Sequence, residues 1–163
     1  MDDPVFTVSR TFHAPRALVW KAHSEIEHLA RWWGPKGFTW LKGTLDFRPG
    51  GMFHYGMRAP DGSEMWGKFV YREIAAPERI VFVNSFSDAA GGTTRAPFAA
   101  DWPLEVLNTM SLTEADGRTT VSLRGSPLNA TEAEKKRFEA MRPSMNQGFN
   151  GTFDQLEAYL ATL

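Results

Sequence analysis

The stretch MNQGFNGTFDQLEAYLATL, residues 145–163, spaces its large side chains at regular intervals. Counted from the methionine, the stripe returns at i+4, i+7, i+8, i+11, i+15 and i+18, which is the spacing of one face of an α-helix. A helix about five turns long with a single apolar stripe must bury that stripe against another element. We therefore expect a long C-terminal helix packed on a sheet through Met145, Phe149, Thr152, Phe153, Leu156, Leu160 and Leu163.

The segment before this stretch also predicts a helix. Thr131 and Glu134 have the spacing of a capping box, in which each side chain bonds to the other residue's backbone N–H. The short charged helix that they open runs through Phe138 and Met141, and Pro143 interrupts it.

The middle of the chain predicts six strands. Apolar residues alternate within each strand, and turn residues such as Asp61-Gly62 and Asp116-Gly117 separate several of them. Connections this short favour an antiparallel meander. The predicted strands are FTWLKGTLDF (38–47), GGMFHYGMRA (50–59), EMWGKFVYREI (64–74), RIVFVNSF (79–86), LEVLNTMSLTEA (104–115) and RTTVSLRGS (118–126).

The N-terminal part adds one strand and two short helices. VFTVSRTF (5–12) alternates with period two, as a strand does. HAPRALVWKAH (13–23) and SEIEHLARWW (24–33) each favour a short helix, and Gly34-Pro35 stops the second. The result is an α+β fold with a curved antiparallel sheet of seven strands wrapped on the long helix. One helix does not fill the whole concavity, so we expect an apolar cavity of the kind that binds small molecules.

Composition favours one domain spanning residues 1–163. A chain of this length with 42% hydrophobic residues can bury a sizeable core. The net charge of −1 argues against a nucleic-acid partner, and the absence of cysteine excludes disulfides and thiolate metal sites. No leader pattern opens the chain and no apolar run has the length of a membrane span, so we expect a cytoplasmic protein without a membrane partner.

Four segments resemble, in order and spacing, the bacterial homologues of the activator of heat-shock-protein ATPase, within the START-like (SRPBCC) superfamily. The resemblance covers nearly the whole chain. It implies a helix-grip fold, like that of the birch pollen allergen, around a hydrophobic cavity. Members of the superfamily include co-chaperone domains, lipid and polyketide binders, and cyclases. The segments are APRALVWKAHSEIEHLARWWGPKGF (14–38), DFRPGGMFHYGMRAPDG (46–62), MWGKFVYREIAAPERIVF (65–82) and GFNGTFDQLEAYL (148–160).

Alternation along the strands selects candidate cavity residues. The more apolar face of each strand should turn inward, which brings the Tyr55 hydroxyl and the amides of Asn84 and Asn108 into an apolar space where each needs a partner. Trp32 and Trp33 lie about 100° apart on a helix, so one should face the core and the other the cavity mouth or a partner. Plain core packing is the alternative for every candidate. The set is Trp32, Trp33, Trp40, Phe53, Tyr55, Trp66, Phe82, Asn84, Asn108, Met110, Phe149 and Phe153.

The loop SDAAGGTTRAPFAADWP (87–103) is far longer than the roughly two to five residues of most hairpins. We predict that it forms a lid over the cavity mouth or contacts a dimer partner, with Phe98 or Trp102 as its anchor. Arg95 is either held in an ion pair, with Asp88 and Asp101 nearby in sequence, or free for an acidic group of a ligand. A disordered insertion is the alternative.

Catalytic motifs are sparse. The four histidines lack metal-site spacing, and the chain has no nucleophile elbow, phosphate loop or dinucleotide signature. We expect no metal and no cofactor, and we assign no catalytic residue. The favoured function is binding of a hydrophobic or aromatic small molecule. The alternatives are a cyclase-like or aromatase-like enzyme on a hydrophobic substrate, and a protein partner, either a second copy or, less favoured, a chaperone.

Overall fold

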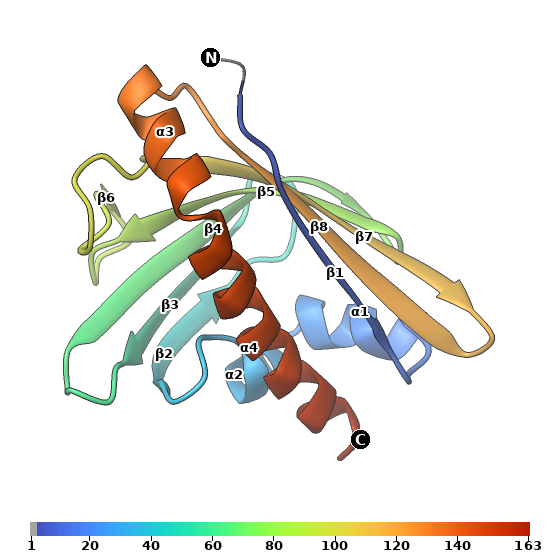
Figure 1. Ribbon diagram of the computed structural model, residues 1–163. Coiled ribbons are helices and arrows are strands. Elements are labelled where there is room, and N and C mark those ends of the chain that lie inside the picture. The colour runs from blue at the N-terminus through green and yellow to red at the C-terminus, as the bar shows by residue number, and fades with distance from the viewer. Residues whose placement is uncertain (1–2) are drawn as a thin grey trace.

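The computed structural model describes residues 3–163 and contains an eight-stranded sheet and four helices (Figure 1). In chain order the elements are β1 (Phe6–Phe12), α1 (Arg16–Ser24), α2 (Ile26–Trp32), β2 (Thr39–Leu45), β3 (Met52–Arg58), β4 (Glu64–Ala75), β5 (Arg79–Ser87), β6 (Thr93–Thr94), β7 (Val106–Ala115), β8 (Arg118–Pro127), α3 (Glu132–Ala140) and α4 (Arg142–Leu160).

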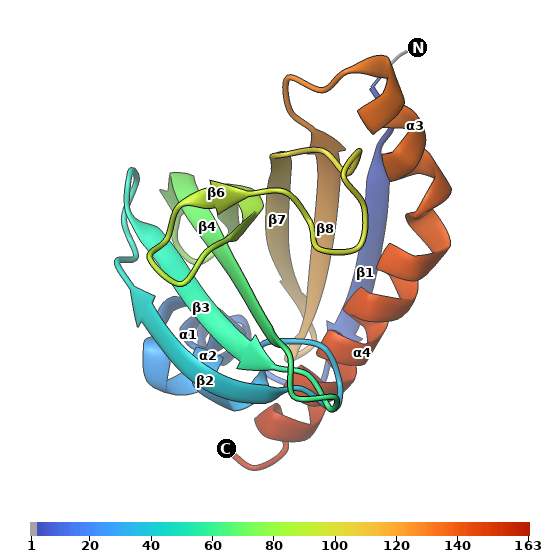
Figure 2. The ribbon, with the colours of Figure 1, turned by 90° about the vertical axis from the view of Figure 1, so that its left-hand side faces the viewer.

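The sheet is antiparallel throughout and has the strand order β1-β8-β7-β5-β4-β3-β2, with β6 paired to β5. It is strongly curved, and α4 crosses its concave side while α1 and α2 close one end (Figures 1 and 2). Six of these strands correspond to the six predicted between residues 38 and 126, and β1 to the predicted N-terminal strand. The α+β helix-grip fold expected from the sequence is therefore confirmed.

The stripe on α4 packs on the sheet as predicted over its C-terminal half. Phe153 is 3% exposed and meets the ring of Phe12 on β1 edge-on, with 5.7 Å between the ring centroids. Met145 and Phe149, nearer the start of the helix, are only partly buried. Leu163 is 54% exposed, so the predicted end of the stripe was wrong. The helix ends at Leu160, and beyond that residue the helical spacing no longer sets the side-chain direction.

The capping box at the start of α3 is present. The Thr131 hydroxyl accepts from the Glu134 backbone N–H at 3.1 Å, and the Glu134 carboxylate accepts from the Thr131 backbone N–H at 2.9 Å. Pro143 lies in the first turn of α4, where a missing N–H costs nothing. The predicted interruption of α3 by Pro143 was wrong, because α3 ends at Ala140, before the proline, and Met141 separates the two helices.

The predicted long loop contains one short strand that the sequence did not indicate. Thr93 and Thr94 form β6, which pairs with Ser87 and Phe86 at the end of β5. The loop is therefore folded back along the sheet, and the alternative of a disordered insertion does not apply. This is why the sheet has eight strands where seven were predicted.

The two short helices are fastened to each other and to α4. The Trp32 indole N–H donates to the carbonyl of Ala22 in α1 at 3.0 Å. The Gln155 amide donates to the carbonyls of Trp32 and Gly34, the first at 3.2 Å and the second at 2.5 Å. These bonds hold the end of α2 against α4. No helix within residues 3–163 combines the length and the apolar character needed to cross a membrane.

Candidate functional site

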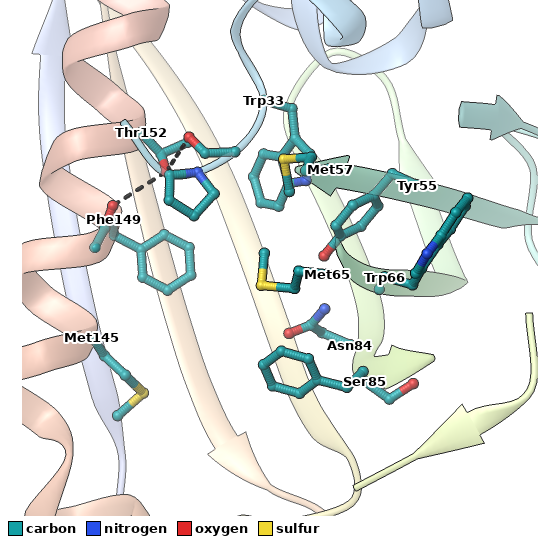
Figure 3. A pocket seen from close by; sticks show the side chains of 15 residues that line it. Trp33, Tyr55, Met57, Met65, Trp66, Asn84, Ser85, Met145, Phe149 and Thr152 are labelled. Carbon is teal, nitrogen blue, oxygen red and sulfur yellow. Dashed lines mark hydrogen bonds between the residues drawn. The ribbon is translucent and has the colours of Figure 1, made fainter. Parts of the chain in front are cut away.

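A cavity of about 240 Å³ lies between α4 and the strands β3, β4 and β5 (Figure 3). The turn after α2, residues 33–35, forms its third side. None of the residues that line it carries a charge. Figure 3 shows the side chains of Phe149 and Met145 reaching in from α4, opposite Tyr55 and Asn84 on the strands.

The turn after α2 places Trp33 on the cavity wall. Gly34 has a φ of +121°, a conformation that favours glycine. A Cβ at this position would also lie 2.2 Å from the Met57 sulfur, so the turn can approach β3 only at a glycine. The Thr152 hydroxyl of α4 lies 3.1 Å from the Gly34 carbonyl, which fixes the turn against the helix (Figure 3). The fixed turn holds the Trp33 ring against the strands. There the ring meets that of Phe69 edge-on, with 5.1 Å between the ring centroids.

Tyr55 is the polar group at the centre of the strand side. It is 6% exposed, and burial raises the pKa of its hydroxyl to about 12, so the hydroxyl stays protonated at neutral pH. The side chains of Asn84 and Trp33 beside the hydroxyl oppose part of this rise in pKa. The hydroxyl fits over Gly67, where an added Cβ would lie 2.5 Å from its oxygen.

A second space, of about 330 Å³, lies beneath the loop between β5 and β7. It shares Asn84, Phe86, Met145 and Phe149 with the first cavity, so the two spaces adjoin. Its other walls come from the loop, α3, β1 and β7–β8, and include Phe6, Phe98, Trp102, Asn108 and Phe138.

The loop is anchored through Trp102. This residue is 8% exposed and stacks on Phe138 of α3 with 5.4 Å between ring centroids. Phe98 is 54% exposed and meets Phe86 edge-on at 5.7 Å. Of the two predicted anchors, only Trp102 is deeply buried.

Arg95 is held in an ion pair, but not by the nearby aspartates. Its guanidinium binds the carboxylate of Glu134 on α3 and donates to the Trp102 carbonyl at 3.2 Å. Asp101 instead binds Arg137 at 2.8 Å, and Asp88 accepts backbone N–H bonds within its own turn. The suggestion of Asp88 or Asp101 as partner was wrong because α3, far away in sequence, folds back beside the loop.

A third, smaller space of about 70 Å³ lies deeper in the core. Trp33, Asn84, Phe149 and Thr152 border both this inner hollow and the first cavity. Four further predicted residues border the inner hollow but neither of the two larger spaces: Trp32, Phe82, Met110 and Phe153. Asn108 borders the inner hollow and the space beneath the loop.

Two predicted residues border none of these spaces. Phe53 is 0% exposed, and Trp40 stacks on it at 6.3 Å between ring centroids, so both belong to the core beside the cavity. The ring of Trp40 lies over Gly43, where it would meet an added Cβ at 2.2 Å.

Trp66 borders the first cavity, but its ring lies on the outer face of the sheet. There it stacks on His54 at 5.3 Å, covers Gly56 and donates to Glu64 at 3.1 Å. The inward positions of β4 are Met65, Gly67, Phe69 and Tyr71, which alternate in the sequence.

The residues that sequence reasoning missed include Phe86, which borders both the first cavity and the space beneath the loop, three methionines and a histidine. Met57, Met65 and Met145 line the first cavity, and His23 lines the inner hollow. The strand alternation contained the signal for Met57 and Met65, and the α4 stripe contained it for Met145. The sequence contained no signal for His23, since its position at the hollow depends on how α1 packs on the rest of the fold. Within residues 3–163, no three His, Asp or Glu side chains are grouped so as to hold a metal ion.

The comparisons with known proteins agree with this architecture. A solution structure from Arthrobacter aurescens is 26% identical, with a TM-score of 0.78 over 98% of this chain and 87% of the other. A crystal structure of a Mycobacterium smegmatis protein is 24% identical, with a TM-score of 0.77 over 97% and 94%. A protein from Silicibacter pomeroyi, with 18% identity, a TM-score of 0.75 and coverage of 98% and 99%, shares the fold. No curated protein matched the chain.

Family membership follows from a match that spans most of the chain. Residues 13–161 match the family described as "Activator of Hsp90 ATPase homolog 1-like protein". The matched range contains all four helices and every strand after β1. The chain therefore belongs to the Activator of Hsp90 ATPase homolog 1-like family.

Proposed function

We propose that this protein binds an uncharged aromatic or hydrophobic small molecule in the cavity between the sheet and α4. The observation that carries the proposal is the wall of the cavity of about 240 Å³, which is built from aromatic rings and methionine side chains and contains no charged residue. START-like proteins commonly bind hydrophobic ligands, and this chain has their fold.

The polar groups of the wall define the class of ligand. An ionised ligand buried here would find no opposite charge, and an unpaired buried charge is very costly. The Tyr55 hydroxyl and the Asn84 amide are neutral, and they suit a hydroxyl, carbonyl or ether group on an otherwise apolar molecule. Met57, Met65 and Met145 add flexible, polarisable surface that adapts to the shape of a ring system.

We further propose that the loop between β5 and β7 is a lid. It covers the adjoining space of about 330 Å³, and the Trp102–Phe138 stack fastens it to α3. The exposed ring of Phe98 lies at the edge of this space, where it can contact a bound ligand or a second copy of the chain.

Native mass spectrometry of the freshly purified protein tests the proposal first. A bound compound adds a defined mass to that of the 18.3 kDa chain. A thermal-shift series with naphthalene and 2-methylnaphthalene follows, because a ligand that binds only the folded state raises the melting temperature. Chromatography of the recovered compound separates binding from conversion. The proposal would be contradicted if the purified protein carries no compound and neither naphthalene nor 2-methylnaphthalene changes its melting temperature.

A further inference from the structure

The inner hollow of about 70 Å³ holds a buried acceptor that nothing in the described chain satisfies. His23 is 6% exposed, and its Nε2 atom has no hydrogen-bond partner within residues 3–163. Buried polar atoms are normally bonded, so an unbonded one beside a space indicates that something else binds there.

The other ring nitrogen determines what Nε2 can do. Nδ1 lies 2.8 Å from the carbonyl of Val19, one turn earlier in α1, and a carbonyl only accepts, so Nδ1 carries the proton. Burial lowers the pKa of His23 to about 4, which keeps the ring neutral at physiological pH. Nε2 is therefore a pure acceptor. Of the two ring nitrogens, Nε2 is the one not bonded to Cγ, so it lies at the end of the ring farther from the backbone of α1.

The hollow adjoins the first cavity, because Trp33, Asn84 and Phe149 border both spaces. The Trp33 indole N–H is buried beside the Tyr55 hydroxyl, so it is not counted as a free donor to the hollow. The unbonded acceptor is therefore Nε2 of His23, and the O–H of a hydroxyl group can donate to it.

We propose that the inner hollow is a subsite for a hydroxyl group of the ligand, whose O–H donates to Nε2 of His23. The proposal rests on the proposed function and narrows its ligand to phenols and related aromatic alcohols. The ring system fills the cavity beside Phe149, and the hydroxyl reaches past Trp33 into the hollow. An internal water bound to His23 is the competing occupant, since the space is large enough for one.

Two matched compounds separate these possibilities. 2-Naphthol and 2-methylnaphthalene have nearly the same shape, and only the first donates a hydrogen bond. Their dissociation constants are measured by calorimetry for the wild type and for His23→Phe, which keeps a buried ring but removes the acceptor. The ratio of the two dissociation constants is then compared between the two proteins, because the cost of desolvating the hydroxyl enters both ratios equally and cancels in this comparison. We expect His23→Phe to lower the preference for 2-naphthol at least about fivefold and to leave 2-methylnaphthalene within about twofold.

A second measurement uses the unaltered protein. In ¹⁵N spectra of the histidine side chains, the Nε2 resonance of His23 should move when 2-naphthol is added and stay in place with 2-methylnaphthalene. If both compounds bind but the ratio is the same in both proteins and the resonance does not move, the hydroxyl subsite is overturned while the proposed function stands. If neither compound binds the wild type, the proposed function fails and the subsite with it.

Discussion

Replacement of Gly148 by leucine should make the protein more stable and a poorer binder at once. Gly148 lies within α4 on the border of the cavity. Apart from the helix's own backbone, no described atom lies within 4 Å of the place where a Cβ would stand. A leucine therefore enters open space at the cavity wall without a clash, and it fills room that a ligand would use.

The two effects have separate magnitudes. A glycine-to-leucine change inside a helix contributes about 0.7 kcal/mol to the free energy of unfolding, which is about 2 °C in the melting temperature of a domain this size. If the new side chain displaces a ligand from about 60 Å² of apolar wall, the loss is about 1.5 kcal/mol, or roughly tenfold in the dissociation constant.

Thermal melts and calorimetry with 2-methylnaphthalene measure both quantities. Gly151→Ala is the matched control, because Gly151 lies in the same helix, borders no cavity, and would place its Cβ 3.8 Å from that of Lys36, an ordinary contact. The control should gain stability and bind normally. A Gly148→Leu protein that binds as tightly as the wild type would refute the placement of the ligand.

Three other changes test the remaining parts of the structure. Phe153→Asp should cost about 3–5 kcal/mol, because it removes a core ring that is now 3% exposed and buries a charge in its place, and a melting temperature within a degree or two of the wild type would contradict the packing of α4. Replacing residues 89–100 by a short Gly-Ser turn should leave the circular dichroism spectrum unchanged but weaken ligand binding, measured by calorimetry, or dimerisation, measured by gel filtration. If binding and association are both unchanged, the proposal that this loop is a lid is wrong. Because burial lowers the pKa of His23 to about 4, the unfolded chain takes up a proton between about pH 6.5 and 4 that the folded chain excludes, so stability should fall by roughly 3 kcal/mol as the pH drops through that range. His23→Phe should flatten this part of the curve of unfolding free energy against pH, and an unchanged slope would show that His23 is not the group responsible.

The elements of the fold were predictable because each has a local cause. Period-two alternation marks β3 and β5, the spacing of Phe149, Phe153 and Leu156 marks α4, and Thr131 with Glu134 marks the start of α3. These signals need no knowledge of distant contacts. The arrangement followed from the short connections between strands and from the need to bury the α4 stripe on a sheet, and the family resemblance implied the same helix-grip arrangement.

The site was predictable only where alternation decides direction. Tyr55, Asn84 and Asn108 lie on the walls of the cavity and its adjoining spaces. Trp66 is a predicted lining residue, but its ring lies on the outer face of the sheet. Gly56 has no side chain, so the Trp66 ring packs over it there.

The remaining features depend on contacts between distant segments. Glu134 meets Arg95 because α3 returns beside the loop, and the environment of His23 depends on the packing of α1. Such contacts can be predicted from the sequence only after the arrangement of the helices and strands is known. Trp40 and Phe53 show the same limit, since both point inward but stop in the core beside the cavity.

The pairing of β1 with β8 has a consequence for synthesis of the protein. Phe6 lies opposite Gly125, so β1, the earliest strand of this sheet in chain order, has as its partner the last strand, β8. β1 can join the sheet only after residues 118–127 have emerged, and until then the apolar side chains of Phe6, Val8 and Phe12 lack their final cover. The growing chain therefore carries an unpaired, apolar strand until β8 has emerged, and such a segment is of the kind that chaperones and neighbouring nascent chains bind.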